Sequence, residues 1–116
     1  MSGPFTIVVR RRGKTDKHAF PTLAEAVDAL ETELRAAATV VAQGRHVERA
    51  LGRDYAPAQQ VAVRGELRGP GRLHAGVDVR GDGEAQAFIG RIKRRPVEPR
   101  EREDAWAALR RVLELG

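Results

Sequence analysis

Apolar residues at every second position predict a β-hairpin at the start of the chain. Phe5, Ile7 and Val9 alternate with more polar neighbours, which predicts a strand from Phe5 to Arg12. A turn-like cluster, Gly13-Lys14-Thr15-Asp16, follows, and a short extended piece then ends at Phe20. We therefore expect a hairpin whose second arm is short.

A second block of alternating residues predicts three more strands. These are Gln59 to Arg68, Arg72 to Arg80 and Glu84 to Arg94. Their connections, Gly69-Pro70-Gly71 and Gly81-Asp82-Gly83, are too short for anything except antiparallel hairpins. The block therefore predicts a three-strand meander.

Two other segments have apolar residues three or four positions apart, the spacing that is typical of a helix. Thr22 and Glu25 have the spacing of a capping box just before a periodic run, and Gly44 is a plausible stop about 20 residues later. The apolar stripe of this helix is Leu23, Val27, Leu30, Leu34, Ala38 and Val41. A further turn of helix is expected at Val47 to Leu51. The last helix should open after Pro96 and Pro99 and bury a stripe of Trp106, Leu109 and Leu113.

These elements together predict one α+β domain over residues 1–116, with 1–4 and 116 flexible. We expect two layers, with an antiparallel sheet of four to five strands and two helices on one face, in the order β-β-α-β-β-β-α. No stretch reaches 18 apolar residues, so we expect no membrane contact and a bacterial-type cytoplasmic location.

Composition adds a strong bias toward arginine. The chain has 18 Arg, 3 Lys and no Cys, and its net charge is +5. The absence of Cys excludes a disulfide framework, a zinc ribbon and a thiol nucleophile. Codon usage in a GC-rich genome explains how many arginines there are. It does not explain their placement, because residues 1–20 and 57–95 each carry +4 while 21–56 and 96–116 are net acidic.

The strand blocks therefore predict an arginine-rich sheet face. If the alternation holds throughout, seven Arg and Lys side chains share that face with Glu66 and Asp78. Such a face attracts phosphates, and we expect a non-catalytic module that binds an acidic partner, most concretely the nucleic-acid backbone, RNA or DNA. The expected binding residues are Arg10, Arg12, Arg64, Arg68, His74, Arg80, Arg91 and Lys93.

Two alternatives stay open for this face. Cross-strand ion pairs of Arg with Glu or Asp solvate a sheet without any ligand. None of the five aromatic residues falls clearly on the polar face, since Phe5 and Phe20 have the phase of the core and Trp106 lies on a helix stripe, so bases would find nothing to stack on. The phase of the 84–94 strand should direct Phe88 inward and Ile89 outward. The other alternative is a protein interaction module that forms a homodimer, through an open strand edge or through Trp106, Val112 and Leu115 of the last helix.

One family resemblance rests on the order of elements. From Thr22 onward the chain resembles the double-stranded RNA-binding domain, with a helix, a three-strand meander and a second helix. Gly69-Pro70 followed by His74 is similar to a Gly-Pro and His in that family, which would imply binding to duplex RNA. The chain departs from the family at 99–104, which is mostly acidic where the family is basic, and Gly69-Pro70 and His74 are spaced too far apart.

The sequence contains few residue patterns that would indicate a catalytic site. The three histidines, His18, His46 and His74, do not have a metal-ligand spacing, and Ser2 is the sole serine. Glu66 and Asp78 could face each other across neighbouring strands as an acid-base pair, but the flanking arginines favour ion pairs. We therefore expect no enzyme activity, no metal and no cofactor.

Overall fold

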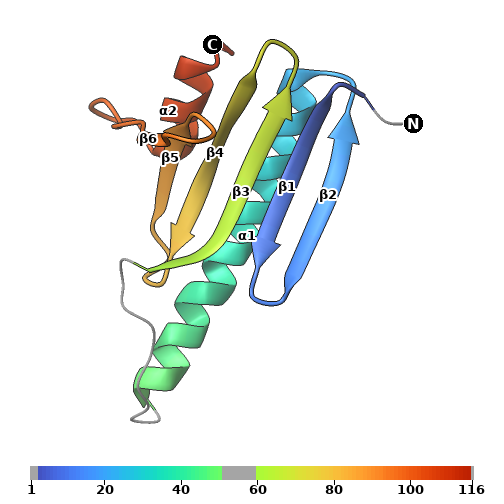
Figure 1. Ribbon diagram of the computed structural model, residues 1–116. Coiled ribbons are helices and arrows are strands. Elements are labelled where there is room, and N and C mark those ends of the chain that lie inside the picture. Colours follow the sequence, from blue (N-terminus) through green and yellow to red (C-terminus); the bar gives the residue numbers. More distant parts are fainter. Residues whose placement is uncertain (1–2, 51–59, 116) are drawn as a thin grey trace.

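The computed structural model describes residues 3–50 and 60–115, and the side chains of 3–44 and 60–115. Its centre is a six-stranded antiparallel sheet in the order β2-β1-β3-β4-β5-β6 (Figure 1). The strands are β1 (Phe5–Arg11), β2 (Lys14–Phe20), β3 (Val61–Gly69), β4 (Leu73–Arg80), β5 (Ala85–Ile89) and β6 (Arg95–Pro96). The helices are α1 (Leu23–Ala50) and α2 (Ala105–Val112). The α+β class and the two-layer arrangement are confirmed, with six strands in the sheet because Arg95–Pro96 adds a short one.

The predicted hairpins form, but the first differs from the prediction in its turn and in the length of its second arm. The turn lies at Arg12 and Gly13, and residues 14–16, which were expected in the turn, begin β2. β1 pairs with β2 from Phe5↔Phe20 to Arg11↔Lys14, so the second arm is as long as the first and not short. Gln59, where the third strand was expected to begin, lies outside the described residues. The N-terminal hairpin joins the meander through β1, which pairs with β3 from Thr6↔Arg68 to Arg11↔Val63.

The capping box at the start of α1 is present. The Glu25 backbone N–H donates to Thr22 Oγ1 at 3.2 Å, and the Thr22 hydroxyl donates to the Glu25 carboxylate at 3.0 Å. The expected stop at Gly44 is wrong, because α1 continues to Ala50 and includes Val47. A glycine inside a helix costs only about 1 kcal/mol relative to alanine and does not end it. Leu51 lies outside the described residues.

Helix α1 is longer than the sheet that it covers. Its 28 residues span about 42 Å, whereas a seven-residue strand spans about 23 Å. Figure 1 shows the C-terminal half of α1 running past the end of the sheet. The buried side chains among residues 23–44 of this helix accordingly lie between positions 26 and 37: Ala26, Val27, Leu30, Leu34 and Ala37.

The main core lies between the sheet and the two helices. Leu30 and Leu34 approach Gly65 of β3 so closely that a Cβ there would lie 2.7 and 2.5 Å from their Cδ1 atoms. Glycine at this point lets the helix sit against the sheet. Phe5 and Phe20 pack against the same core as expected, and Trp106 is buried in it.

The third strand of the meander differs from the prediction. It ends at Ile89 and not at Arg94, since Gly90 has φ +96°, a conformation that favours glycine and turns the chain. Residues 95–96 then return as β6 beside Phe88 and Ile89. Phe88 pairs with Gly76, and Ile89 pairs with Ala75 of the core, so Ile89 faces the helices and Phe88 the opposite side. The predicted phase of this strand is wrong.

Helix α2 begins later than expected. Asp104, not a residue near Pro99, caps it, and the Asp104 carboxylate accepts the Ala107 backbone N–H at 2.8 Å. The same contact holds the pKa of Asp104 below its usual value. Arg110 ties α2 to α1 through Asp28 at 2.9 Å and Glu31 at 2.8 Å. Within 3–50 and 60–115, no helix is long and apolar enough to cross a membrane.

Candidate functional site

On the side of the sheet away from α1 and α2, the described residues form no helix, and we call this side the open face. Figure 1 looks onto this face, with α1 behind the sheet. Cross-strand register places Arg10 beside Arg64, Val8 beside Glu66, and Arg68 beside His74. The arginine-rich strand residues therefore lie together as expected, and the helices cover the other side.

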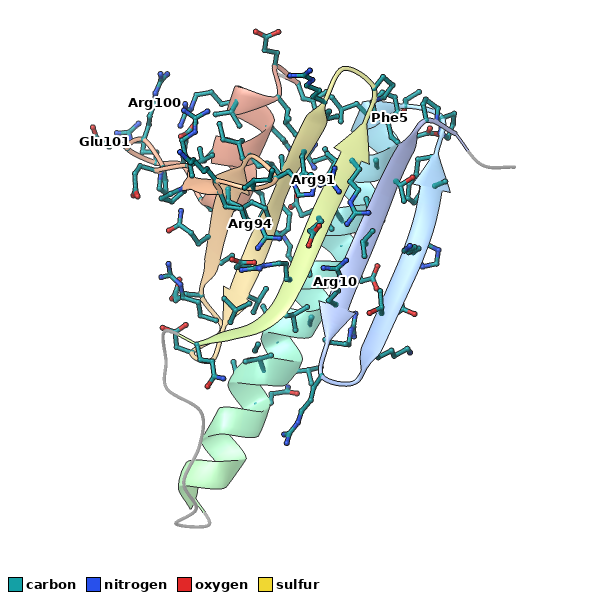
Figure 2. The ribbon with its side chains drawn as sticks, in the orientation of Figure 1. Phe5, Arg10, Arg91, Arg94, Arg100 and Glu101 are labelled. Carbon is teal, nitrogen blue, oxygen red and sulfur yellow. The ribbon has the colours of Figure 1, made fainter. Side chains whose placement is uncertain are left out.

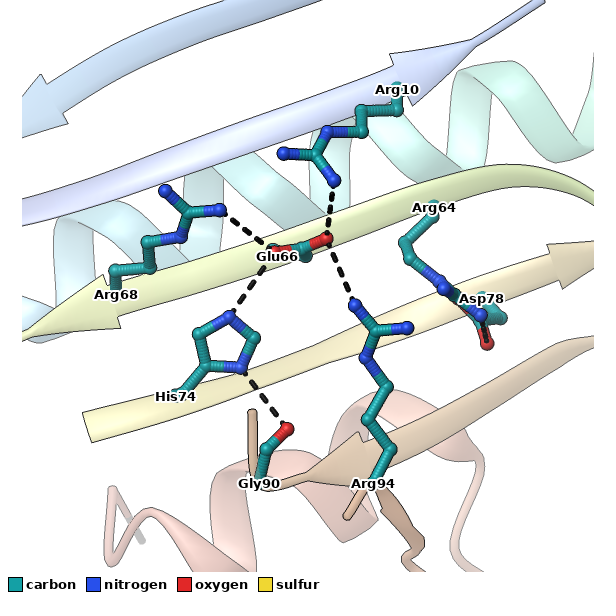
Figure 3. Close-up of polar contacts among 8 residues, drawn as sticks. All are labelled: Arg10, Arg64, Glu66, Arg68, His74, Asp78, Gly90 and Arg94. Atoms are coloured by element: carbon teal, nitrogen blue, oxygen red, sulfur yellow. Dashed lines mark hydrogen bonds and ion pairs between the residues drawn. The ribbon is translucent and has the colours of Figure 1, made fainter. Parts of the chain in front are cut away.

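A buried carboxylate lies at the centre of the open face. Glu66 is 1% exposed and contacts cationic or polar groups from four segments (Figure 3). Arg10 Nη1 donates to Oε1 at 3.2 Å and Arg94 Nη2 donates to Oε1 at 3.4 Å. Arg68 Nη2 donates to Oε2 at 3.2 Å, and His74 Nε2 lies 3.1 Å from Oε2. We call Glu66, Arg10, Arg68, Arg94 and His74 the Glu66 cluster.

The cluster keeps Glu66 charged although it is buried. Burial acts to raise the pKa of this carboxyl, but hydrogen bonds from Arg68 and His74 and the charge of Arg10 outweigh burial and hold the pKa below its usual value. Three guanidinium groups meet one carboxylate, so the cluster has an excess of positive charge. It is thus a fixed cationic centre.

A second ion pair lies next to the cluster. Arg64 holds Asp78 with two hydrogen bonds, Nε to Oδ1 at 2.6 Å and Nη2 to Oδ2 at 3.0 Å. The bidentate contact raises the pKa of Arg64 above its usual value. Glu66 and Asp78 therefore each form ion pairs with arginines, and the two carboxylates do not form an acid-base pair with each other.

His74 is less accessible than the alternation predicts. It was expected on the wet surface, yet its side chain is buried, with Nε2 at Glu66 and Nδ1 3.1 Å from the Gly90 carbonyl oxygen. The Gly90 N–H also donates to the His74 carbonyl at 2.9 Å. His74 therefore ties the Glu66 cluster to the 90–94 segment and is not available as a direct binding residue.

The open face also has a small apolar layer that alternation does not reveal. Val8 is fully buried there and Phe88 is 4% exposed, although neither belongs to the main core. The Phe88 ring covers Gly76, where a Cβ would lie 2.7 Å from Phe88 Cζ. Arg64 and Arg94 sit over the ring at 5.7 and 5.3 Å from its centroid. An aromatic residue thus lies on this face, but arginines cover it and leave no platform for a base.

The remaining predicted residues divide into two groups. Arg80 follows Val79 of the core, so the alternation of β4 directs it to the open face. Arg12 lies in the β1–β2 turn and not on a strand, and Arg91 and Lys93 lie exposed in the 90–94 loop. Figure 2 shows Arg10, Arg91 and Arg94 over the open face. These turn and loop residues extend the cationic surface beyond the strands.

Two basic residues of the open face are absent from the sequence prediction. The sequence predicts Arg94 on the 84–94 strand, with a phase that directs its side chain toward the core. The strand ends at Ile89, five residues earlier. Lys17 pairs with Val8 and so shares the open face. The register of the first hairpin would have indicated Lys17, whereas no local pattern indicates the turn at Gly90 that brings Arg94 back to Glu66.

Comparison with known protein families, characterised proteins and solved structures gives no match. The element order also departs from the expected resemblance to the double-stranded RNA-binding domain, because β6 adds a fourth strand between α1 and α2. Among the described residues, no three His, Asp or Glu side chains are placed to hold a metal ion. The Glu66 cluster and the basic residues around it remain the strongest candidate site.

Proposed function

We propose that the open face binds the phosphate backbone of nucleic acid with little sequence preference. The observation that carries the proposal is the Glu66 cluster, in which one buried carboxylate fixes three arginines on a surface that neither α1 nor α2 covers. Phosphate contacts of this kind position a protein on nucleic acid without reading bases.

The arginines of the cluster keep hydrogen-bonding capacity for a ligand. A guanidinium has five N–H donors, and Arg10, Arg68 and Arg94 each use one nitrogen on Glu66. The side chains of Arg10 and Arg68 are 49% and 43% exposed. Their position is set in advance, so less side-chain entropy is lost when a phosphate binds.

The surroundings add further positive charge. Lys17 and Arg80 lie on the same face, and Arg91 and Lys93 border it from the 90–94 loop. The nearby carboxylates are Glu66 and Asp78, both already paired with arginines. Because arginines cover Phe88, no base can stack on this ring, and the expected binding is electrostatic and falls steeply with salt.

The test is fluorescence anisotropy with labelled 20-base-pair RNA and DNA duplexes at 50 mM salt, repeated up to 200 mM. Micromolar affinity with a steep salt dependence is expected. The triple variant Arg68→Ala, Arg91→Ala and Lys93→Ala should reduce the slope of log Kobs against log salt by about 1 for each phosphate that the variant no longer neutralises. The control Lys14→Ala, Arg100→Ala and Arg102→Ala removes equal charge elsewhere and should keep the slope.

Two results would reject the proposal. One is the absence of any anisotropy change with micromolar protein at 50 mM salt, which would leave the ion pairs as solvation of the sheet. The other is an equal loss of affinity in the control variant, which would mean that net charge alone drives binding.

Homodimer formation is the competing proposal, and its best support is the unpaired edge of β2. That edge carries Lys14, Asp16 and Lys17, and charges of this kind discourage edge pairing. At the other edge, β6 has two residues, one of them Pro96. Sedimentation of the wild-type chain near twice 12.7 kDa would favour the dimer.

A further inference from the structure

A groove opens at the end of the sheet where β1 and β3 part. Pairing between these strands ends at Arg11 and Val63, and an irregularity in β3 between Val61 and Val63 accompanies a bend away from β1. Figure 1 shows α1 running behind this end of the sheet, and residues of α1 line the groove. The groove has a volume of about 1010 Å³, at the upper end of the range for small-molecule sites.

The bottom and one wall of the groove are apolar. Ala37, Val40 and Val41 of α1 form the bottom, and residues 61–63 form the wall. Val40 and Val61 are 65% and 40% exposed, and within the described part of the chain they are two of three large apolar side chains that are this exposed. Exposed apolar side chains gathered in a hollow mark a binding site more often than scattered ones do.

The rim of the groove is cationic. Arg10, Arg11 and Arg12 line one side and Arg64 the other, and none of the described lining residues is Asp or Glu. Arg10, Arg11 and Arg64 are anchored by Glu66, Glu33 and Asp78. Arg12 is exposed and makes no ion pair among the described residues. An apolar floor beneath an arginine rim complements a molecule with an apolar body and an anionic end.

We propose that this groove binds a monomeric amphipathic anion, an alkyl chain of medium length that ends in a carboxylate or phosphate. The chain would lie along Val40, Val41 and Val61, and the headgroup would meet Arg12 and its neighbours. The volume of the groove favours a small molecule, because it lies at the upper end of the range for such sites. The inference does not depend on nucleic-acid binding.

Calorimetric titration with hexanoate, octanoate and decanoate below their micelle concentrations tests the apolar part. Affinity should rise roughly two- to fourfold for each added methylene until the groove is filled. Acetate and inorganic phosphate should bind at least a hundredfold more weakly than decanoate, and decyltrimethylammonium should not bind. Decyl phosphate tests whether the rim accepts either headgroup.

Variants test the location of the site. Val40→Glu should weaken decanoate binding at least tenfold, and Arg12→Gln by about fivefold, since both remove groups that face the proposed ligand. Ile92→Glu and Arg100→Gln make matched changes at exposed positions elsewhere and should leave the affinity unchanged. Val40 and Arg12 are exposed, so the thermal unfolding of all four variants should match wild type.

Several outcomes would overturn the proposal. They are affinity independent of chain length, affinity unchanged by Val40→Glu, and binding to anionic vesicles without binding to monomeric decanoate. A wild-type dimer that Val40→Glu converts to monomer, with no decanoate binding, would instead assign the groove to a contact between two copies of the chain.

Discussion

The two faces of the sheet are stabilised in different ways. On the helix side the buried residues are apolar, from Ile7 and Leu67 on the strands to Leu30 and Leu34 on α1. On the open face the described part of the chain buries two apolar side chains, Val8 and Phe88, and two polar ones, Glu66 and His74. One face is a conventional core, and the other is a charged network over a thin apolar layer.

The two faces also differ in how far the stabilisation from a buried side chain depends on the particular residues around it. Each apolar side chain on the helix side stabilises the folded protein because it is removed from water, largely irrespective of which apolar neighbour it contacts. Burial alone does not make Glu66 stabilise the folded protein. Glu66 stabilises it only through its contacts with the arginines and His74 of the cluster. A change on the helix side should therefore be insensitive to pH, and a change on the open face should depend on it.

The largest expected effect lies on the helix side. Leu34→Ala removes a fully buried side chain that packs against Gly65, and it should lower the free energy of unfolding by about 3 kcal/mol. Urea denaturation at pH 7 and at pH 4 should give the same loss. Val40→Ala, a similar truncation at an exposed position of α1, should change stability by less than about 0.5 kcal/mol. Equal losses in the two variants would contradict the assignment of the core.

The next effect separates the two faces by pH. Glu66→Gln removes the charge on which the cluster converges and should lower the free energy of unfolding by about 2 kcal/mol at pH 7. In the folded state the pKa of Glu66 lies below its usual 4.5. Ionised Glu66 therefore contributes its full stabilisation above about pH 4.5, and this is lost as the pH falls through the lower folded value.

The measurement is the unfolding free energy of wild type and Glu66→Gln between pH 7 and pH 3. The difference in unfolding free energy between wild type and Glu66→Gln should become smaller as the pH falls toward 3. The difference between wild type and Leu34→Ala should stay constant. A Glu66→Gln loss that does not change with pH would mean that shape, and not charge, holds this position.

Much of the helix side follows from the sequence. The capping box at Thr22 and Glu25, the glycine-rich turns and the alternation of β1, β3 and β4 depend on neighbours within a few residues, and these predictions are confirmed. The predicted end of α1 is wrong because the penalty for a glycine such as Gly44 is too small to stop a long helix.

The open face is harder to predict because it joins distant segments. Glu66 has the pattern of an ordinary exposed carboxylate on an alternating strand, and its burial requires Arg10, His74 and Arg94 to meet it from other parts of the chain. The pairing of Phe88 with Gly76 in the β4–β5 hairpin places Phe88 on the open face, and the turn at Gly90 ends the strand before Arg91 and Lys93. Alternation assigns a residue to a face but does not tell what the other strands place beside it.

A smaller effect is expected at the neighbouring ion pair. Asp78→Asn removes the charge that Arg64 holds with two hydrogen bonds, and both side chains are partly exposed. Solvent screening limits the loss to about 1 kcal/mol. The comparison is with Glu66→Gln in the same urea series. A larger loss at Asp78 than at Glu66 would shift the centre of the open face from the cluster to this pair.

The smallest effect on stability should come with a clear effect on binding. Arg10→Ala leaves Glu66 with Arg68, Arg94 and His74, so the carboxylate stays compensated. Because Arg10 is half exposed, its removal should cost less than about 0.5 kcal/mol of unfolding free energy. The same variant should weaken duplex binding severalfold at 50 mM salt, since it removes one fixed guanidinium from the open face.

Unfolding and anisotropy measured on the same Arg10→Ala preparation decide between the two roles of this face. Loss of affinity at unchanged stability would identify arginines that the fold holds in place for a ligand. Loss of stability at unchanged affinity would contradict the proposed function and make the cluster a structural counterpart of the apolar core on the other side.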